Sequence, residues 1–250
     1  MSQEASTRYL IGVLGGMGPG ATIDFMSKIM AATSADVDQE HVPLIVYDVP
    51  QIPNRSIAIQ TGSDSPFLPM MAGIRMLERS GVDVVAIPCN TAHFWYDRLA
   101  SSCQVSIIHI ADAVATMIHT LEMDVRRVAL MATRGTVATG IYRQRLSGVV
   151  RELVEPDEPI QQLIDQAVDA VKAGEITRAR FCAERACSRL LEQGADLLLI
   201  GCTELPIALA GSEFQPLSID ATEALARACV QASLGVRSLT SVAQLGTRAR

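Results

Sequence analysis

The sequence predicts an α/β fold of two similar lobes, each with a mainly parallel sheet flanked by helices. Strand and helix patterns alternate along the chain, which is typical of parallel sheets covered by helices. Two distant segments also match: residues 81–91 (GVDVVAIPCNT) and 194–204 (GADLLLIGCTE) each run from a glycine through an apolar stretch to a cysteine. We therefore expect pseudo-symmetric lobes that face each other across a cleft.

Eight apolar runs are the expected strands. Most of them are continuously apolar rather than alternating, as is usual for strands buried on both faces of a parallel sheet. They cover residues 9–14, 43–49, 82–87, 105–110, 128–131, 152–154, 197–200 and 216–219.

Each cysteine-bearing strand follows an amphipathic helix. Apolar residues at helical spacing mark residues 68–79 and 179–192, and a glycine that can cap the helix comes soon after each. The match between the two halves reaches farther back, because residues 12–18 and 128–136 both follow a strand and precede a helix. The duplication therefore covers most of each lobe.

We expect the chain to change lobes near residues 112–125. The first lobe would comprise residues 1–113 and 214–250, and the second lobe residues 114–213. The polar end of the chain, residues 240–250, is expected to be frayed.

Composition and charge limit the partners of the protein. Hydrophobic residues make up 49% of the chain and charged residues 19%, with a formal net charge of -6. Nucleic-acid binders normally carry a basic patch, so no nucleic-acid partner is expected. No apolar stretch approaches the roughly 18 residues needed to cross a bilayer, and the first residues (MSQEASTR) lack the apolar core of a secretory signal. We expect a cytoplasmic protein with no membrane partner.

The six cysteines are too few for a disulfide scaffold. No Cys-x-x-Cys pair occurs, and Cys182 and Cys187 lie on a helical pattern without a nearby histidine, so no metal is expected. These two residues, with Cys103 and Cys229, are most simply small buried hydrophobic side chains.

Cys89 and Cys202 are the strongest candidates for chemistry. Ligands of open parallel sheets bind beyond the carboxyl ends of the strands, where both cysteines are expected. Two thiols facing one carbon from opposite sides could remove a proton from one face and return one to the other, with the active site in the cleft between the lobes. A helix N-terminus after each thiol is expected to lower its pKa from about 8.5 towards neutrality. The simpler interpretation, two structural cysteines, does not explain sulfur at matching positions of both copies.

The glycine-rich loop at residues 15–20 (GGMGPG) allows two interpretations. A dinucleotide site would use Asp48 as the ribose-binding acid, but Asp48 lies farther from the loop than the roughly 20 residues of that fingerprint. Pro19 also removes an N–H group from the turn. We favour a loop whose backbone N–H groups meet a small carboxylate, with Met17 and Gly18 as candidate substrate-binding residues.

Three further side chains are candidates of unequal strength. Arg55 follows the second predicted strand in a proline-stiffened loop, where its guanidinium can grip a carboxylate with two parallel hydrogen bonds. The alternative for Arg55 is a solvated surface position. Lys172 is a weaker candidate, because a lysine near a helix end is often only a favourable dipole contact. His93 is expected to support the loop after Cys89, since helical register turns it away from the thiol.

Three of these segments resemble the signature segments of the aspartate/glutamate racemase family: residues 15–19 (GGMGP), 89–93 (CNTAH) and 201–204 (GCTE). The resemblance spans roughly residues 9–230. It implies two similar α/β domains, a homodimer and no cofactor. It also implies an enzyme that interconverts the L and D forms of a small acidic amino acid, with aspartate as the first candidate.

The resemblance also implies a role for each matching residue. Cys89 and Cys202 would be the opposed acid and base. The residues implied for binding are Asn90, Thr91, Thr133, Thr136 and Thr203 for the amino-acid backbone, Arg55 for the side-chain carboxylate, and Lys172 as a further cation. Asn54-Arg55-Ser56 stands where the family often has Asp-Arg-Thr, which keeps the arginine in place.

Other functions remain open on the sequence alone. Glutamate is a further substrate candidate, because one methylene is worth only about 1 to 3 kcal/mol of discrimination. Relatives resembling hydantoin racemases, maleate cis-trans isomerases or arylmalonate decarboxylases use one cysteine alone or as a nucleophile. A non-catalytic protein that binds an acidic metabolite is the third possibility. The presence of both thiols favours racemisation.

Overall fold

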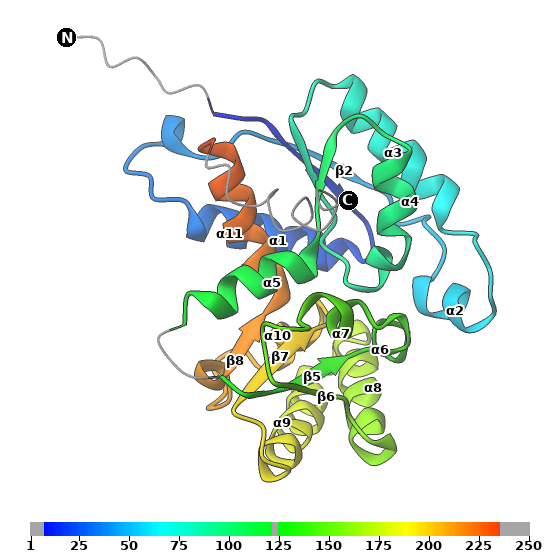
Figure 1. Ribbon diagram of the computed structural model, residues 1–250, viewed down its shortest axis with the longest axis vertical. Coiled ribbons are helices and arrows are strands. Elements are labelled where there is room, and N and C mark those ends of the chain that lie inside the picture. The colour runs from blue at the N-terminus through cyan, green and yellow to red at the C-terminus, as the bar shows by residue number, and fades with distance from the viewer. Residues whose placement is uncertain (1–7, 122–124, 236–250) are drawn as a thin grey trace, which may run out of the picture.

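A computed structural model of the chain describes residues 8–121 and 125–235. These residues form two four-stranded parallel sheets, with the strand orders β2-β1-β3-β4 and β6-β5-β7-β8 (Figure 1). In both sheets the first strand along the chain lies between the second and the third, and the fourth lies beside the third. Helices flank both sheets. The predicted α/β class with two similar lobes is confirmed.

The strands coincide with the eight predicted apolar runs, shifted by a few residues at their ends. In the first sheet they are β1 (Ile11–Gly15), β2 (Leu44–Asp48), β3 (Val84–Ala86) and β4 (Ser106–Ile108). In the second sheet they are β5 (Arg127–Ala132), β6 (Glu152–Val154), β7 (Leu197–Gly201) and β8 (Ser218–Asp220).

Eleven α-helices and three 3₁₀ turns connect the strands of the described residues. The helices are α1 (Pro19–Ala32), α2 (Arg55–Gln60), α3 (Phe67–Arg79), α4 (Tyr96–Ser101), α5 (Ile110–His119), α6 (Arg134–Thr139), α7 (Ile141–Arg145), α8 (Glu158–Lys172), α9 (Ile176–Glu192), α10 (Leu205–Ala208) and α11 (Ala221–Ser233). The turns are η1 (Asp38–Glu40), η2 (Thr91–Trp95) and η3 (Gln215–Leu217).

Each sheet buries its outer face under a pair of helices. In the first lobe Leu14 and Val85 pack with Met70 and Ile74 of α3, and α4 completes this layer. In the second lobe α8 and α9 cover the outer face, whose side chains are those of Ala129, Met131, Leu198 and Ile200. Alternate residues of β5 and β7 point to opposite faces, which is why these strands are apolar throughout.

The inner faces of the two sheets share one hydrophobic core. Ile11 and Val13 of β1 belong to the same cluster of buried residues as Val128 and Leu130 of β5. Helices α1, α5 and α11 contribute to this cluster and lie between the sheets (Figure 1). Because the core is continuous from one lobe to the other, the lobes are joined by packing as well as by the chain.

The helices before the two cysteine-bearing strands end as predicted. Gly81 follows the end of α3 with φ +80, and Gly194 follows the end of α9 with φ +88. Glycine adopts this left-handed conformation without the steric cost that a Cβ adds, so it stops each helix and turns the chain into β3 or β7.

Two details differ from the expected lobe boundaries. The predicted crossing point between residues 113 and 114 falls inside α5. The last strand, β8, pairs with β7 and so lies in the second sheet, although residues from 214 onward are predicted in the first lobe. It is α11 that returns to pack against α1 and α5. The division into two units remains a prediction, and residues 240–250, predicted to fray, lie outside the described residues.

No helix of the described residues is both long enough and apolar enough to span a membrane.

Candidate active site

A cavity of about 420 Å³, counting the space open to solvent, lies at the carboxyl ends of the strands and takes side chains from both lobes. The first sheet's lobe contributes residues after β1, β2 and β3. The second contributes the residue after β5, the last residue of α8, and residues at and after the end of β7. Its lining residues are Met17, Asn54, Arg55, Ser56, Cys89, Asn90, Thr91, Thr133, Lys172, Gly201, Cys202, Thr203 and Glu204. The cavity occupies the place that open parallel sheets give to ligands.

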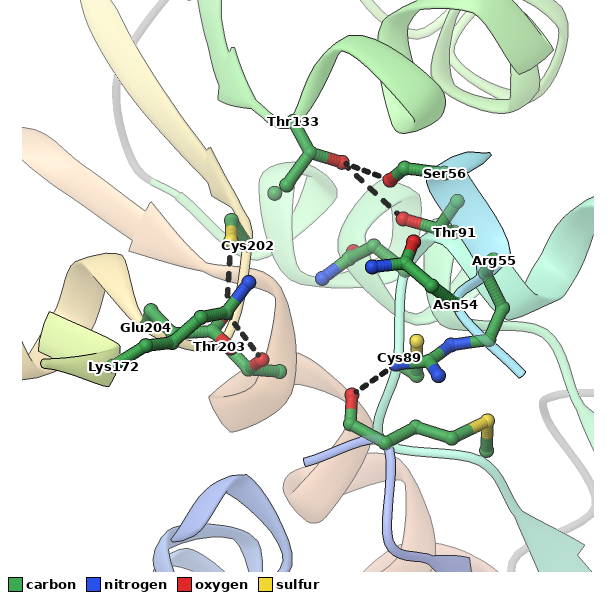
Figure 2. A pocket seen from close by; sticks show the side chains of 13 residues that line it. Asn54, Arg55, Ser56, Cys89, Thr91, Thr133, Lys172, Cys202, Thr203 and Glu204 are labelled. Carbon is green, nitrogen blue, oxygen red and sulfur yellow. Dashed lines mark hydrogen bonds between the residues drawn. The ribbon is translucent and has the colours of Figure 1, made fainter. Parts of the chain in front are cut away.

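The two predicted cysteines enter this cavity from different lobes. Cys89 follows β3 and Cys202 follows β7, and the two are 6% and 5% exposed. Figure 2 shows Cys202 with Glu204 and Lys172 on one side of the pocket, and Cys89 with Arg55 on the other. Both residues are free cysteines. Cys89 and Cys202 therefore line the same cavity.

Cys202 has a carboxylate as its immediate partner. Its Sγ donates a hydrogen bond to Glu204 Oε2 at 3.1 Å, and Thr203 Oγ1 donates to the same oxygen at 3.0 Å. Burial raises the pKa of Cys202 well above its ordinary value, and the charge of Glu204 raises it further, against a smaller lowering by Lys172. The prediction that a helix N-terminus lowers this pKa is wrong for Cys202, because α10 after it has only four residues and the desolvated thiol faces an anion.

Arg55 is fixed at the cavity wall by backbone carbonyls. Its Nη1 donates to the carbonyls of Ile52 and Pro53, and its Nη2 donates to that of Met17 at 3.0 Å. Its Nε is buried and has no hydrogen-bond partner among the described residues. Arg55 is the first residue of α2, whose N-cap is Asn54, so the loop after β2 sets its position. The solvated alternative for Arg55 is wrong, since three carbonyls hold the guanidinium at the cavity.

A cluster of hydroxyl groups joins the lobes beside the thiols. Thr91 Oγ1 lies 2.8 Å from Thr136 Oγ1 and 3.3 Å from Thr133 Oγ1, and Ser56 Oγ donates to Thr133 at 3.5 Å. Thr133 also caps α6. Thr136 is buried behind Thr91 and Thr133 and does not line the cavity, whereas the other three do.

Asn90 lines the cavity and is held at one end of its amide. Its Oδ1 accepts a hydrogen bond from Tyr142, and its Nδ2 is buried without a partner among the described residues. Arg55 Nε and Asn90 Nδ2, on two residues that line the cavity, are thus donors without a partner among the described residues. Buried polar groups are normally satisfied, so orphaned donors in a cavity indicate where a ligand binds.

Lys172 adds a second cation at the edge of the cavity. It is the last residue of α8, is exposed, and makes no ion pair among the residues that the structure describes. Arg55 and Lys172 together outweigh the single carboxylate of Glu204, so the cavity suits an anionic ligand.

The glycine-rich loop is folded tightly against the end of the second strand. A Cβ at Gly16 would come within 2.3 Å of the backbone of Val49. Asp48 accepts a hydrogen bond from Thr22 Oγ1 at 2.7 Å, at the start of α1. Met17 lines the cavity, but Gly18 does not. The geometry gives no support to a dinucleotide site, because the proposed ribose-binding acid is already used to close the loop.

His93 lies outside the cavity, as predicted. Its ring is buried, its Nε2 contacts the carbonyl of Ile87 at 3.2 Å, and it packs on the ring of His109. Burial lowers the pKa of His93 to about 4, so it is neutral at pH 7. No group of three or more His, Cys, Asp or Glu residues suited to a metal ion occurs among the described residues.

The residues that form this cavity lie within a known family pattern. The sequence model of the Asp/Glu/hydantoin racemase family matches residues 14–229. The chain belongs to this family. The resemblance inferred from the three motifs is thereby confirmed, and the racemase class of isomerases with it.

Individual racemases and their homologues resemble the chain over nearly its whole length. The structure of Picrophilus torridus aspartate racemase is 31% identical and superposes with a TM-score of 0.80, covering 91% of this chain and 94% of that one. The broad specificity amino-acid racemase RacX of Bacillus subtilis (strain 168) is 27% identical over 92% of this chain and 100% of RacX. An aspartate racemase homologue from Pyrococcus horikoshii OT3 shares the fold, with 22% identity and a TM-score of 0.73 over 90% of this chain and 99% of that one.

Sequence reasoning missed several residues of this racemase's cavity. Glu204, Asn54, Ser56 and Gly201 all line it without having been chosen as site residues. Each is directly adjacent in the sequence to a predicted site residue, so sequence proximity was the available signal. Tyr142 was missed for another reason: it reaches Asn90 from the other lobe, a contact that only the folded chain creates.

Proposed function

We propose that this family member is a cofactor-independent racemase that interconverts L- and D-aspartate by two-base proton transfer. The observation that carries the proposal is that Cys89 and Cys202 line one cavity from different lobes. Racemisation needs a proton acceptor and a proton donor on opposite faces of the α-carbon. Two thiols supply both functions from the chain itself.

The proposed reaction begins with one cysteine as thiolate and the other as thiol. The thiolate removes the α-proton, the electron pair of the C–H bond moves into the adjacent carboxylate, and the opposite thiol protonates the other face. After the reaction the first cysteine is a thiol and the second is a thiolate. A positioned acid or base contributes about 10²- to 10⁴-fold to the rate. An α-proton is much less acidic than a thiol, so donors around the carboxylate must also stabilise the developing charge, at about 3 kcal/mol each.

The free donors of the cavity suit an amino acid with two carboxylates. Asn90, Thr91, Thr133 and Thr203 would bind the backbone end, with Thr136 behind them. Arg55, whose buried Nε lacks a partner among the described residues, would receive the side-chain carboxylate. Lys172 would assist from the cavity edge.

Aspartate is favoured over glutamate and over neutral amino acids. The 31% identity to Picrophilus torridus aspartate racemase supports aspartate, and the similarity to RacX supports a wider range as the second candidate. Arg55→Met separates them: its loss should reduce kcat/KM for aspartate by about 100-fold while a neutral amino acid is affected much less. Equal losses for both would contradict the assignment of Arg55 to the side chain.

The direct test incubates the purified protein with each L-amino acid in deuterium oxide. Proton NMR reports loss of the α-hydrogen signal, and chiral chromatography reports inversion. We expect aspartate to exchange and to approach an equal mixture of enantiomers. Binding of aspartate without exchange would instead indicate a non-catalytic binding protein.

The two-base assignment is tested by Cys89→Ser and Cys202→Ser. Each variant should lose nearly all racemase activity, because a serine hydroxyl is too weak an acid and base for either role at neutral pH. Retention of near wild-type turnover by either variant would exclude two-base chemistry. Activity on hydantoins or on maleate, or decarboxylation of arylmalonates, would point to the one-cysteine reactions of related enzymes.

The proposal includes a cytoplasmic homodimer. A reaction that depends on two reduced thiols suits a reducing compartment. Light scattering after size-exclusion chromatography tests the dimer, and a monomer mass for the active protein would overturn it.

A further inference from the structure

Tyr142 touches both cysteine-bearing segments of the site, although it belongs to neither. It lies on α7, and its side chain is 1% exposed. Its hydroxyl donates a hydrogen bond to Oδ1 of Asn90, the residue after Cys89. A Cβ built on Gly201, the residue before Cys202, would come within 3.1 Å of the Tyr142 ring. One buried side chain therefore spans the distance between the two segments.

The hydroxyl of Tyr142 engages the Oδ1 end of the Asn90 amide and leaves the Nδ2 end without a partner among the described residues. An asparagine side chain can turn its amide by half a rotation, which exchanges an acceptor for a donor. With Oδ1 held by Tyr142, the Nδ2 group points to the side where it has no partner among the described residues. The reverse orientation would present a carbonyl oxygen to the carboxylate of a substrate and repel it.

Tyr142 acts as a donor because its own environment keeps it protonated. Burial raises the pKa of Tyr142 well above its ordinary value, with smaller effects in the same direction from Asp220 and Cys202. A neutral phenol donates its hydrogen to the nearest strong acceptor, which here is the amide oxygen.

We propose that Tyr142 is a positioning residue of the active site: its hydroxyl sets the Asn90 amide so that Nδ2–H donates to the substrate carboxylate. Because Tyr142 and Asn90 come from different lobes, the donor is correctly oriented only when the lobes are together. The inference rests on the proposed racemase function for its kinetic consequence, but the orientation of Asn90 exists without substrate.

Tyr142→Phe tests the proposal with little change in volume. We expect kcat/KM for aspartate to fall by about 10- to 100-fold, since a misplaced binding group costs up to about that factor. Tyr96→Phe is the matched control, because the Tyr96 hydroxyl donates to the carbonyl of Ile107 and has no contact with the cavity. This control should stay within about 2-fold of wild type.

The double variant distinguishes positioning from a general structural role. If Tyr142 acts through Asn90, then Asn90→Ala with Tyr142→Phe should be no slower than Asn90→Ala alone, because the amide to be oriented is gone. Independent losses that multiply, or a Tyr142→Phe enzyme within about 2-fold of wild type, would overturn the proposal.

A spectroscopic readout keeps this test separate from the racemase assignment. The side-chain amide signals of Asn90 in a ¹H–¹⁵N spectrum are identified by their loss in Asn90→Ala. They should shift in Tyr142→Phe and remain in place in Tyr96→Phe. Should the wild-type protein racemise no amino acid, the proposed function fails while this shift still supports the orienting role. Unchanged Asn90 signals in Tyr142→Phe would refute that role whatever the activity.

Discussion

Cys89 and Cys202 occupy matching strand ends but have different neighbours. Cys202 faces the carboxylate of Glu204 across a 3.1 Å hydrogen bond, whereas the residue two places after Cys89 is Thr91. A nearby anion favours the protonated thiol, so Cys202 is held in its protonated form. Within the two-base proposal, Glu204 is then the group that receives the thiol's hydrogen bond before Cys202 gives its proton to the substrate.

The charges around Cys202 can be varied in opposite directions. Glu204→Gln removes an anion and should lower the pKa of Cys202, while Lys172→Met removes a cation and should raise it. Only the thiolate reacts with iodoacetamide, so the pH at which Cys202 becomes alkylated reports this pKa. Mass spectrometry of the Cys202 peptide, in a Cys89→Ser background, gives the midpoint. The account would be contradicted if both substitutions shifted the alkylation midpoint in the same direction. It would also be contradicted if Glu204→Gln raised the midpoint above that of the Cys89→Ser parent.

Site residues were predictable where a reactive or charged side chain stands in a recognisable local sequence pattern. A cysteine at the end of a buried apolar run, repeated in both halves, led to Cys89 and Cys202, and a proline-stiffened loop after a strand led to Arg55. The upward shift of the Cys202 pKa was not predictable, because it depends on how deeply the thiol is buried and on which way Glu204 turns. The Asn90 contact with Tyr142 depends on packing between lobes, which local sequence does not encode.

The strands were predictable as elements because each is apolar enough to be buried on both faces. Which strands pair with one another was harder to predict from the sequence. The three-residue strand β8 joins the second sheet through long-range pairing with β7, and α11 then crosses to α1. A short edge strand carries too few residues to show which sheet it extends, and this is why the sequence alone did not show that β8 pairs with β7.

The junction between β8 and α11 is held by a partly buried ion pair. Lys28 of α1 contacts Asp220 at 2.5 Å and also pairs with Asp24, and the Lys28 and Asp220 side chains are 17% and 15% exposed. Burial lowers the pKa of Lys28, but the two carboxylates outweigh it and the net shift is upward. Asp220 is in addition the N-cap of α11. This carboxylate therefore anchors the helix that ties the second sheet to the first lobe.

Substitutions at Asp220 separate the charge from the cap. Asp220→Asn keeps a good N-cap but leaves Lys28 with one carboxylate fewer, and should cost about 1 to 3 kcal/mol of unfolding free energy. Asp220→Ala should cost about 1 kcal/mol more, because the cap is also lost. Urea denaturation measures both. A raised lysine pKa stabilises the fold at every pH below the unfolded value of about 10.4, so the Asp220→Asn deficit should be constant from about pH 6 to 9.

An exposed pair on the same helix is the control for these variants. Glu223 and Arg227 are one turn apart on α11, with side chains 44% and 60% exposed. Glu223→Gln should change the unfolding free energy by less than about 0.5 kcal/mol. A loss as large as that of Asp220→Asn would mean that helix charge, rather than the junction with Lys28, accounts for the effect.

At the scale of the whole molecule, the described parts of the two lobes meet in the shared core of α1, α5 and α11. They meet again beside the cavity, where α6 contacts α2 and η2. At this second contact Gly135 lies against Ser56: a Cβ at residue 135 would come within 2.5 Å of Ser56 Oγ and 2.8 Å of its Cα. We therefore expect the shared core to carry most of the stability, and the approach of α6 to α2 to set the spacing across the cavity.

Gly135→Ala should consequently impair the site more than the fold. Because backbone as well as side-chain atoms of Ser56 obstruct the new methyl group, α2 must move away from α6, and Arg55 and Thr133 move apart with them. We expect kcat/KM for aspartate to fall by about 100-fold, the effect of a displacement near 1 Å at a binding group. The melting temperature should change by only about 2 to 4 °C, since alanine favours helix α6 and the shared core is untouched. Ser56→Gly added to Gly135→Ala removes the obstructing side chain and should restore part of the activity. A Gly135→Ala enzyme with wild-type kcat/KM would mean that the approach of α2 to α6 does not set the separation of Arg55 and Thr133 that catalysis needs.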